Sequence, residues 1–186
     1  MKIYGIVIGF ILVIPTACNS KKKGTGEKPI SATSITRGQL NHLDTSLYQI
    51  TRYKINNGKT DSAWISREEI RDLAADFLSL PDISQGKLIS QYTEEKLIDE
   101  ATNTLSITSM ARNENSEIQK QIIIISLDES ANGKVNSIYI ERYKKHQDSL
   151  FEQKLFWELD KFFQIGNIIH PPDQPEQSEL LKVTWQ

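Results

Sequence analysis

The sequence predicts an α+β domain, with an antiparallel sheet of about six meander strands plus an amino-terminal hairpin. One main amphipathic helix is expected to pack on one face of that sheet. An Asn-Asn-Gly stretch at residues 56–58 separates two strand-like segments, and a helical apolar stripe follows from Ile70 to Leu78. After residue 104 the apolar period changes from near four to two, which is typical of strands. The short breaks between these later segments favour antiparallel neighbours, because a parallel crossover needs a dozen residues or more.

The first element is a hairpin over residues 47–66. Asn57 and Gly58 tolerate positive φ, which the two-residue turn of a tight hairpin requires. A helix is expected directly afterwards, because Ser66 and Glu69 have the spacing of a capping box. Its buried stripe has helical spacing and comprises Ile70, Leu73, Ala74, Phe77 and Leu78. Pro81 should end this helix, and a shorter one is expected after Thr93, with Leu97, Ile98 and Ala101 facing inward.

The remaining chain alternates between apolar and polar residues, as strands with one buried face do. Residues 122–125 are apolar on both faces, so their strand is expected to be covered on both sides. In the last segment, alternation directs Leu181, Val183 and Trp185 inward, so truncation before Leu181 should destabilise the whole domain. The six predicted strands cover about residues 104–110, 118–127, 134–145, 149–159, 161–170 and 180–185.

The first 17 residues have the parts of an export signal. Lys2 supplies positive charge, Ile3 to Ile14 is an uncharged apolar run, and Ala17 is a small residue at the end. Twelve apolar residues are too few to span a bilayer, which takes about 20 in a helix. Residues 1–17 are therefore expected to be a signal peptide.

The boundary at Ala17 and Cys18 resembles the lipobox of bacterial lipoproteins, although Pro15 stands where that family usually has leucine. Together with the hairpin and the late aromatic strands, it makes the chain similar to small, functionally uncharacterised lipoproteins of Gram-negative envelopes. The resemblance implies removal of the leader and lipid attachment at Cys18. Asn19 in place of aspartate implies the outer membrane, and Lys21 to Lys23 in place of an acidic cluster imply its periplasmic face. Cell-surface exposure and an incidental cysteine remain open alternatives.

Residues 18–41 are expected to form a lipidated, basic, flexible tether, because they are polar and rich in Gly, Ser, Thr and Lys. Residues 42–186 are expected to form a single α+β domain without disulfides, since Cys18 is the only cysteine. This domain has 16 basic and 23 acidic residues and a formal net charge of −7. Nucleic acid and a bare anionic membrane are therefore poor partners for this domain, and membrane contact is expected through the lipid at the amino terminus. Lys21 to Lys23 either lie against anionic headgroups or serve as a solubilising charge run.

Five aromatic residues fall within 13 positions and are candidates for a ligand or partner surface: Phe151, Phe156, Trp157, Phe162 and Phe163. They cannot all face one side of a strand. One face could line a groove for an acyl chain, a glycan or a peptide. The alternative is an ordinary two-sided core, with the helix over one face and the hairpin over the other.

Motifs for catalysis or metal binding are not found in the sequence. His42, His146 and His170 have no metal-ligand spacing, and the nucleophile motif G-x-S-x-G does not occur. We therefore expect no cofactor and a non-catalytic envelope protein that binds a periplasmic or outer-membrane partner through its sheet. One alternative is a carrier or sensor of an apolar ligand held by a curved sheet. The other is a hydrolase that uses paired carboxylates, such as those at 68–69, 94–95 and 99–100.

Overall fold

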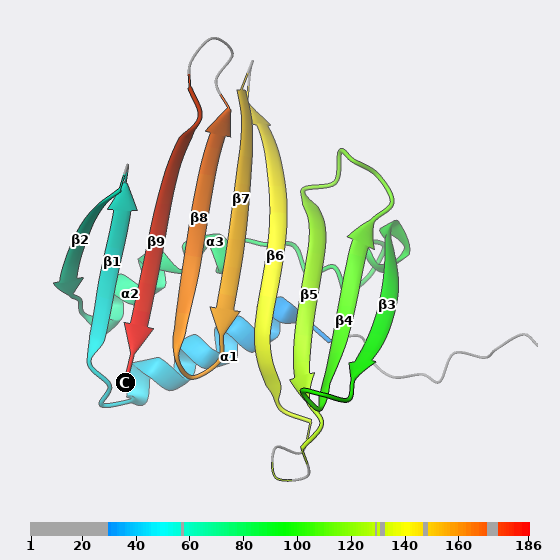
Figure 1. Cartoon of the computed structure of the whole chain (residues 1–186), viewed down its shortest axis with the longest axis horizontal. Helices are drawn as coiled ribbons and strands as arrows, with labels where there is room; N and C mark the ends of the chain where they lie inside the picture. The colour runs from blue at the N-terminus through cyan, green and yellow to red at the C-terminus, as the bar shows by residue number, and fades with distance from the viewer. Residues whose placement is uncertain (1–29, 57, 129, 131–132, 147–148, 171–174) are drawn as a thin grey trace, which may run out of the picture.

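The chain folds into one large sheet with helices on one side (Figure 1). The computed structural model describes residues 30–56, 58–128, 130, 133–146, 149–170 and 175–186. The helices are α1 (Ala32–Thr45), α2 (Arg67–Leu73), α3 (Ala75–Leu78) and the short 3₁₀ helix η1 (Ile89–Gln91). The strands are β1 (Ile50–Asn56), β2 (Lys59–Trp64), β3 (Tyr92–Asp99), β4 (Thr104–Ala111), β5 (Ile118–Ser126), β6 (Val135–His146), β7 (Ser149–Glu158), β8 (Phe162–His170) and β9 (Gln177–Trp185).

All nine strands belong to a single antiparallel sheet of order β2-β1-β9-β8-β7-β6-β5-β4-β3. The prediction of an α+β domain with about six strands, a separate hairpin and one main helix is therefore wrong. The hairpin and the six later strands do form, but β9 pairs with both β8 and β1 and joins them. The described part of the chain is mainly β, with three short α-helices.

Strand β3, which the sequence did not predict, replaces the short helix that was expected after Thr93. Residues Tyr92–Asp99 pair with β4, although Leu97 and Ile98 remain 64% and 62% exposed. The spacing of Leu97, Ile98 and Ala101 suggested a helix with one buried face. However, β3 is an edge strand without a buried face, so its apolar residues do not alternate as those of a half-buried strand do. Asn103, at a φ of 49°, allows the tight connection that turns the chain back into β4.

The helices also differ from the prediction. Ser66 and Glu69 form the expected capping box, but the helix breaks at Ala74 into α2 and α3. Helix α1 is capped by Ser31 and begins at Ala32, inside the predicted tether of residues 18–41. That prediction is wrong from Ala32 onward, because Leu40 is fully buried against the core. Residues 1–29 lie outside the described residues, and so do the predicted signal peptide and Cys18.

The core lies between the helices and the face of the sheet that they cover. Phe77 of α3 makes edge contacts with Trp157 and Phe163, at ring-centroid distances of 5.0 and 5.7 Å. Trp185 packs beside both of these sheet residues. As expected, Val183 and Trp185 of the last strand face inward and are buried. No described helix has the length and apolar content needed to cross a bilayer.

We call the helix-covered side of the sheet the helix face and the opposite side the open face. The predicted packing of the hairpin over the second face does not occur, because the hairpin extends the sheet at its edge. Ile123 and Ile125 are buried on the helix face, whereas Ile122 and Ile124 are only partly buried. The expectation that their strand is covered on both sides is therefore wrong.

Candidate functional site

The five predicted aromatic residues are divided between the two faces. Trp157 and Phe163 are completely buried on the helix face and belong to the core. Phe156 and Phe162 alternate with them, so they are half-buried on the open face, with ring centroids 5.7 Å apart. Phe151 shares the phase of Trp157 but lies near the start of β7, whereas Trp157 lies near its end. The five residues therefore do not form one surface.

The open face carries a row of large side chains across neighbouring strands. Strand pairing places Tyr53, Lys182, Gln164, Phe156 and Tyr139 next to one another in that order. Lys182 also lies over a neighbouring ring, with its Nζ 4.1 Å from the Phe162 centroid. This face is thus aromatic and charged at once.

The tyrosine at the end of this row is held in its neutral form. Tyr139 donates a hydrogen bond of 2.7 Å to Glu141 Oε1. Burial raises the pKa of Tyr139, and the hydrogen bond and charge of Glu141 raise it further. Its hydroxyl therefore acts as a hydrogen-bond donor at neutral pH.

A second row crosses the helix face, and every member of it is polar. Cross-strand pairing places these residues side by side from β1 to β6, and we call them the polar row: Asn56, Glu179, Asn167, Gln153 and Arg142. The next row toward the centre of the sheet is mostly apolar, with Leu181, Ile165, Leu155 and Ile140. The polar row thus marks the boundary where the apolar core ends.

One end of the polar row is deeply buried. Arg142 is 1% exposed and Gln153 is 2% exposed. The Arg142 Nε donates to Gln153 Oε1 at 2.5 Å, and its terminal nitrogens donate to Asp76 Oδ1 of α3 and, at 3.4 Å, to Glu117 Oε1. The guanidinium charge is therefore neutralised by two carboxylates, which anchors α3 to the sheet.

The other end of the polar row opens into a groove. Gln153 Nε2 donates to Asp76 Oδ2 at 3.0 Å and to Asn167 Oδ1 at 2.7 Å. Asn167 in turn lines a hollow of about 300 Å³, beyond the end of the helical layer. Figure 1 shows the upper ends of β7, β8 and β9 extending past the helices. The groove is lined by Asn56, Phe151, Asn167, Ile169, Gln177, Ser178 and Glu179.

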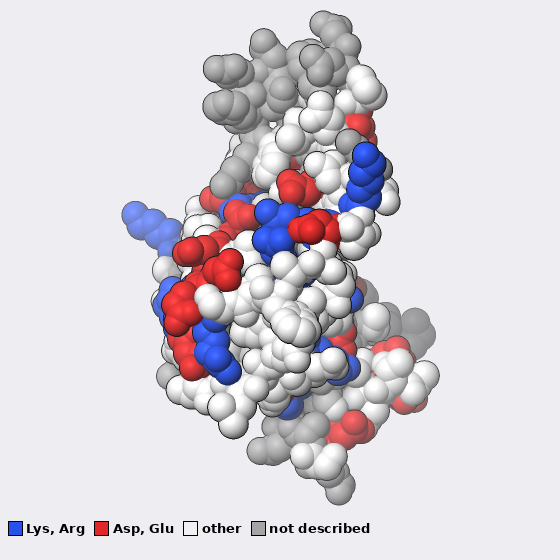
Figure 2. Space-filling view, turned by 90° about the vertical axis from the view of Figure 1, so that its left-hand side faces the viewer, with Lys and Arg blue, Asp and Glu red and all other residues white. Residues whose placement is uncertain are grey.

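A shallower hollow adjoins this groove at the β2 edge of the sheet. It measures about 450 Å³ and shares Asn56 and Glu179 with the groove. It adds charges of both signs from Lys54, Lys59 and Asp61, and Asp61 accepts a 2.8 Å hydrogen bond from Arg52. Figure 2 looks onto this edge, and its acidic side chains gather toward the left, which is the side of the helices.

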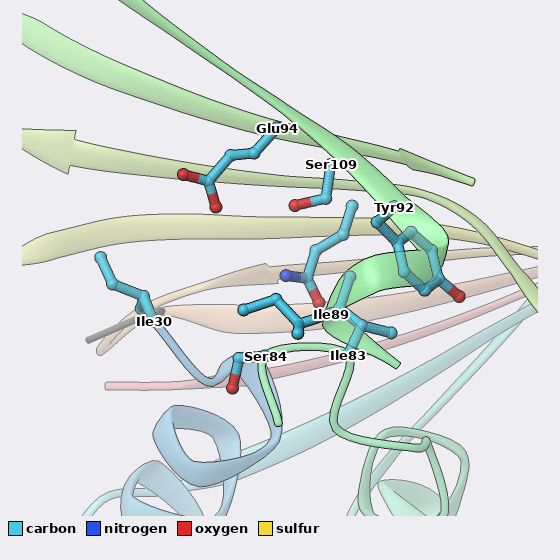
Figure 3. A pocket seen from close by; sticks show the side chains of 8 residues that line it. Ile30, Ile83, Ser84, Ile89, Tyr92, Glu94 and Ser109 are labelled. Atoms are coloured by element: carbon cyan, nitrogen blue, oxygen red, sulfur yellow. The ribbon is translucent and has the colours of Figure 1, made fainter. Parts of the chain in front are cut away.

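An enclosed cavity lies at the opposite edge of the sheet, between β3–β5 and the start of α1. Figure 3 shows Glu94 and Ser109 on the sheet side of it and Ile30 and Ser84 on the other side. Its volume of about 40 Å³ suits a few water molecules, whereas ligand pockets occupy about 300 Å³ or more. Gln121, 6% exposed, faces it without a side-chain hydrogen-bond partner among the described residues. The enclosed space is thus too small for the apolar ligand that a carrier would hold.

The described residues hold no cluster of three or more His, Cys, Asp or Glu side chains suited to a metal ion. The carboxylate pairs considered for a hydrolase do not converge either. Glu69 is part of the α2 cap, and Glu94 and Glu95 point to opposite faces of β3 because they are neighbours on a strand. His170 Nδ1 lies 3.4 Å from Glu176 Oε2, and its Nε2 lies 3.9 Å from Glu152 Oε2.

Sequence reasoning missed the polar row, although the sequence contains a signal for it. Arg142 follows Ile138 and Ile140 at the inward-facing phase of its strand, and Gln153 and Asn167 extend the inward series of β7 and β8 in the same way. In each of these three strands, a polar residue therefore takes an inward-facing position next to the apolar residues of the core. Only the strand registers show that these changes meet in one row.

Comparisons with known proteins add no functional information. A scan against models of protein families found no match. A search of curated proteins also found no relative above the significance threshold.

Proposed function

We propose that this chain is a lipid-anchored, non-catalytic protein of the bacterial envelope that binds a partner protein through the open face of its sheet. The observation that carries this proposal is the one-sided packing of a nine-stranded sheet. The helices pack on one face, and the other presents half-buried aromatic and charged side chains in register. Aromatic residues with polar surroundings are enriched where proteins meet.

The leader sequence supports the lipid anchor in this proposal. Cys18 precedes the first described residue, Ile30, by 12 positions. A chain of that length spans at most roughly 40 Å, so a lipid on Cys18 would keep the domain close to the bilayer. The proposed site is the periplasmic face of the outer membrane.

The surface charges support a protein partner over nucleic acid. Helix α2 alone exposes Glu68, Glu69 and Asp72, in agreement with the acidic side seen in Figure 2. The open face combines Lys154 and Lys182 with Glu141 and Glu152, so its charges are mixed. A mixed, aromatic surface suits another protein better than a polyanion.

The test is site-specific photo-crosslinking in intact envelopes. A photoreactive residue at Gln164, in the middle of the open face, should crosslink a discrete partner. The same residue at Asp72, which is exposed on α2, is the control and should not. Cys18→Ser should prevent palmitate incorporation and abolish the Gln164 crosslink, because the domain is no longer held at the membrane. Equal crosslinking from both positions, or an unaltered Gln164 product without the lipid, would refute the proposal.

A further inference from the structure

We propose that the groove at the end of the polar row binds a neutral carbohydrate. This site is on the helix face and does not depend on the open face or on the lipid anchor. It takes its ligand between Phe151 and Ile169 on one side and the polar row on the other. The argument rests on the position of the polar row, the orientation of Asn167 and the composition of the groove.

Stability alone does not explain the polar row. Arg142 and Gln153 occupy inward positions that Ile140 and Leu155 fill one row away. Replacing buried ion pairs by apolar residues of similar size is often neutral or stabilising, so a buried arginine adds little to stability. Its effect here is to fix the orientation of the groups bonded to it.

That orientation is passed along the row to the groove. Arg142 Nε binds Gln153 Oε1, so the amide nitrogen of Gln153 faces Asn167. Asn167 Oδ1 accepts this hydrogen bond, and its Nδ2 group has no partner among the described residues. Asn167 therefore offers two N–H donors at the groove from a preorganised position, which reduces the entropy lost on binding.

The groove combines donors, acceptors and an apolar wall. Asn56, Asn167 and Gln177 supply amides, Glu179 supplies a carboxylate acceptor, and Phe151 supplies an aromatic ring. A sugar ring has hydroxyls that both donate and accept, and it has C–H groups that pack on an aromatic side chain. Its chemistry therefore matches each part of the groove.

Other ligand classes fit less well. An acyl chain would leave the amides without partners, which is costly in a desolvated site. An anion would be repelled by Glu179, the sole charged residue among the described residues that line the groove. An extended peptide would find little free backbone, because β7 and β8 are each paired on both sides and β1 pairs with β9 as far as Glu179. Among the strand residues that line the groove, this leaves the backbone edge of Gln177 and Ser178 for pairing.

The experiment uses the full chain purified in a phosphocholine detergent, which has no sugar headgroup. Chitotetraose, cellotetraose and maltotetraose are each titrated by saturation-transfer NMR. At least one should bind with a Kd below about 1 mM. Asn167→Ala and Phe151→Ala should each weaken this binding about tenfold, the effect of one lost hydrogen bond or ring contact.

Two matched controls lie on the same strands but on the open face. Gln164→Ala on β8 and Phe156→Ala on β7 should leave the Kd unchanged. Glu179→Gln is an exposed second variant that tests the site without disturbing Gln153, and it should weaken binding at least threefold. The proposal is overturned if none of the three sugars binds the folded chain, or if binding survives the groove variants. It is also overturned if palmitate or a blocked penta-alanine peptide binds the groove instead. Photo-crosslinking from Gln164 and palmitate on Cys18 should persist in every groove variant, so the two proposals can fail separately.

Discussion

Replacing Asp76 by alanine should destabilise the fold through a residue that is far away in sequence. Asp76 on α3 accepts hydrogen bonds from Arg142 and Gln153, both of which are almost fully buried. Without this carboxylate, the buried guanidinium keeps its contact of 3.4 Å to Glu117 as its remaining ion pair. Losing one partner of a buried ion pair costs about 3–5 kcal/mol.

The structure places the expected value at the lower end of that range. The Asp76 side chain is 39% exposed, so water screens the pair and can reach part of the vacated space. We therefore expect Asp76→Ala to lower the free energy of unfolding by about 3 kcal/mol. For a domain of this size, that corresponds to a decrease in Tm of roughly 6–12 °C.

Urea unfolding followed by tryptophan fluorescence measures this effect, because Trp157 and Trp185 are buried in the core. Asp72→Ala, an exposed acid on the neighbouring helix, is the control and should change stability by less than about 0.5 kcal/mol. Combining Asp76→Ala with Arg142→Met removes the stranded charge and should recover much of the loss. A loss below about 1 kcal/mol for Asp76→Ala, or no recovery in the double variant, would show that Arg142 does not depend on this carboxylate.

Three further changes test other parts of the fold. Hydrogen bonds from Lys134 and from the Gln39 amide hold the pKa of Asp160 below its usual value. The ionised Asp160 therefore stabilises the fold fully above about pH 4, and this contribution is lost as the pH falls through the lowered pKa. Acid titration should show a smaller loss of stability for Asp160→Asn than for the parent. The Trp157 indole N–H is buried without an acceptor among the described residues, so Trp157→Phe should cost less than about 2 kcal/mol in urea, whereas Phe77→Ala in the same cluster should cost about 3–5 kcal/mol. Ending the chain after Leu180 should abolish cooperative thermal unfolding by circular dichroism, and a truncated chain that keeps its Tm would contradict the central role of β9.

The elements that could be predicted are those with strong local signals. Gly58 adopts a φ of 76° in the hairpin turn, as expected from Asn-Gly, and Ser66 caps α2 through its own side chain. Helix α1 has the right spacing for burial at Leu40 and Leu43. However, Gly38 and several polar residues lower its apolar content, so the segment was interpreted as a tether.

The elements that could not be predicted depend on pairing between distant residues. Nothing local indicates that Ile50 lies opposite Trp185, so the single sheet could not be derived from alternation alone. The same holds for the candidate site. Alternation indicates which face each aromatic residue occupies, but it does not indicate how far the helices extend. Phe151 therefore lines a groove, while Trp157, in the same phase of the same strand, is core.

The position of β9 between β1 and β8 has a consequence for how the protein is made. The first strand finds its second neighbour only in the last nine residues of the fold, about 130 positions later in the chain. A nascent chain that lacks its final segment would have two separate sheet fragments with unsatisfied edges, and closing such a distant contact is slow. If the protein is exported as an unfolded chain, this late pairing would delay folding until β9 has crossed the membrane.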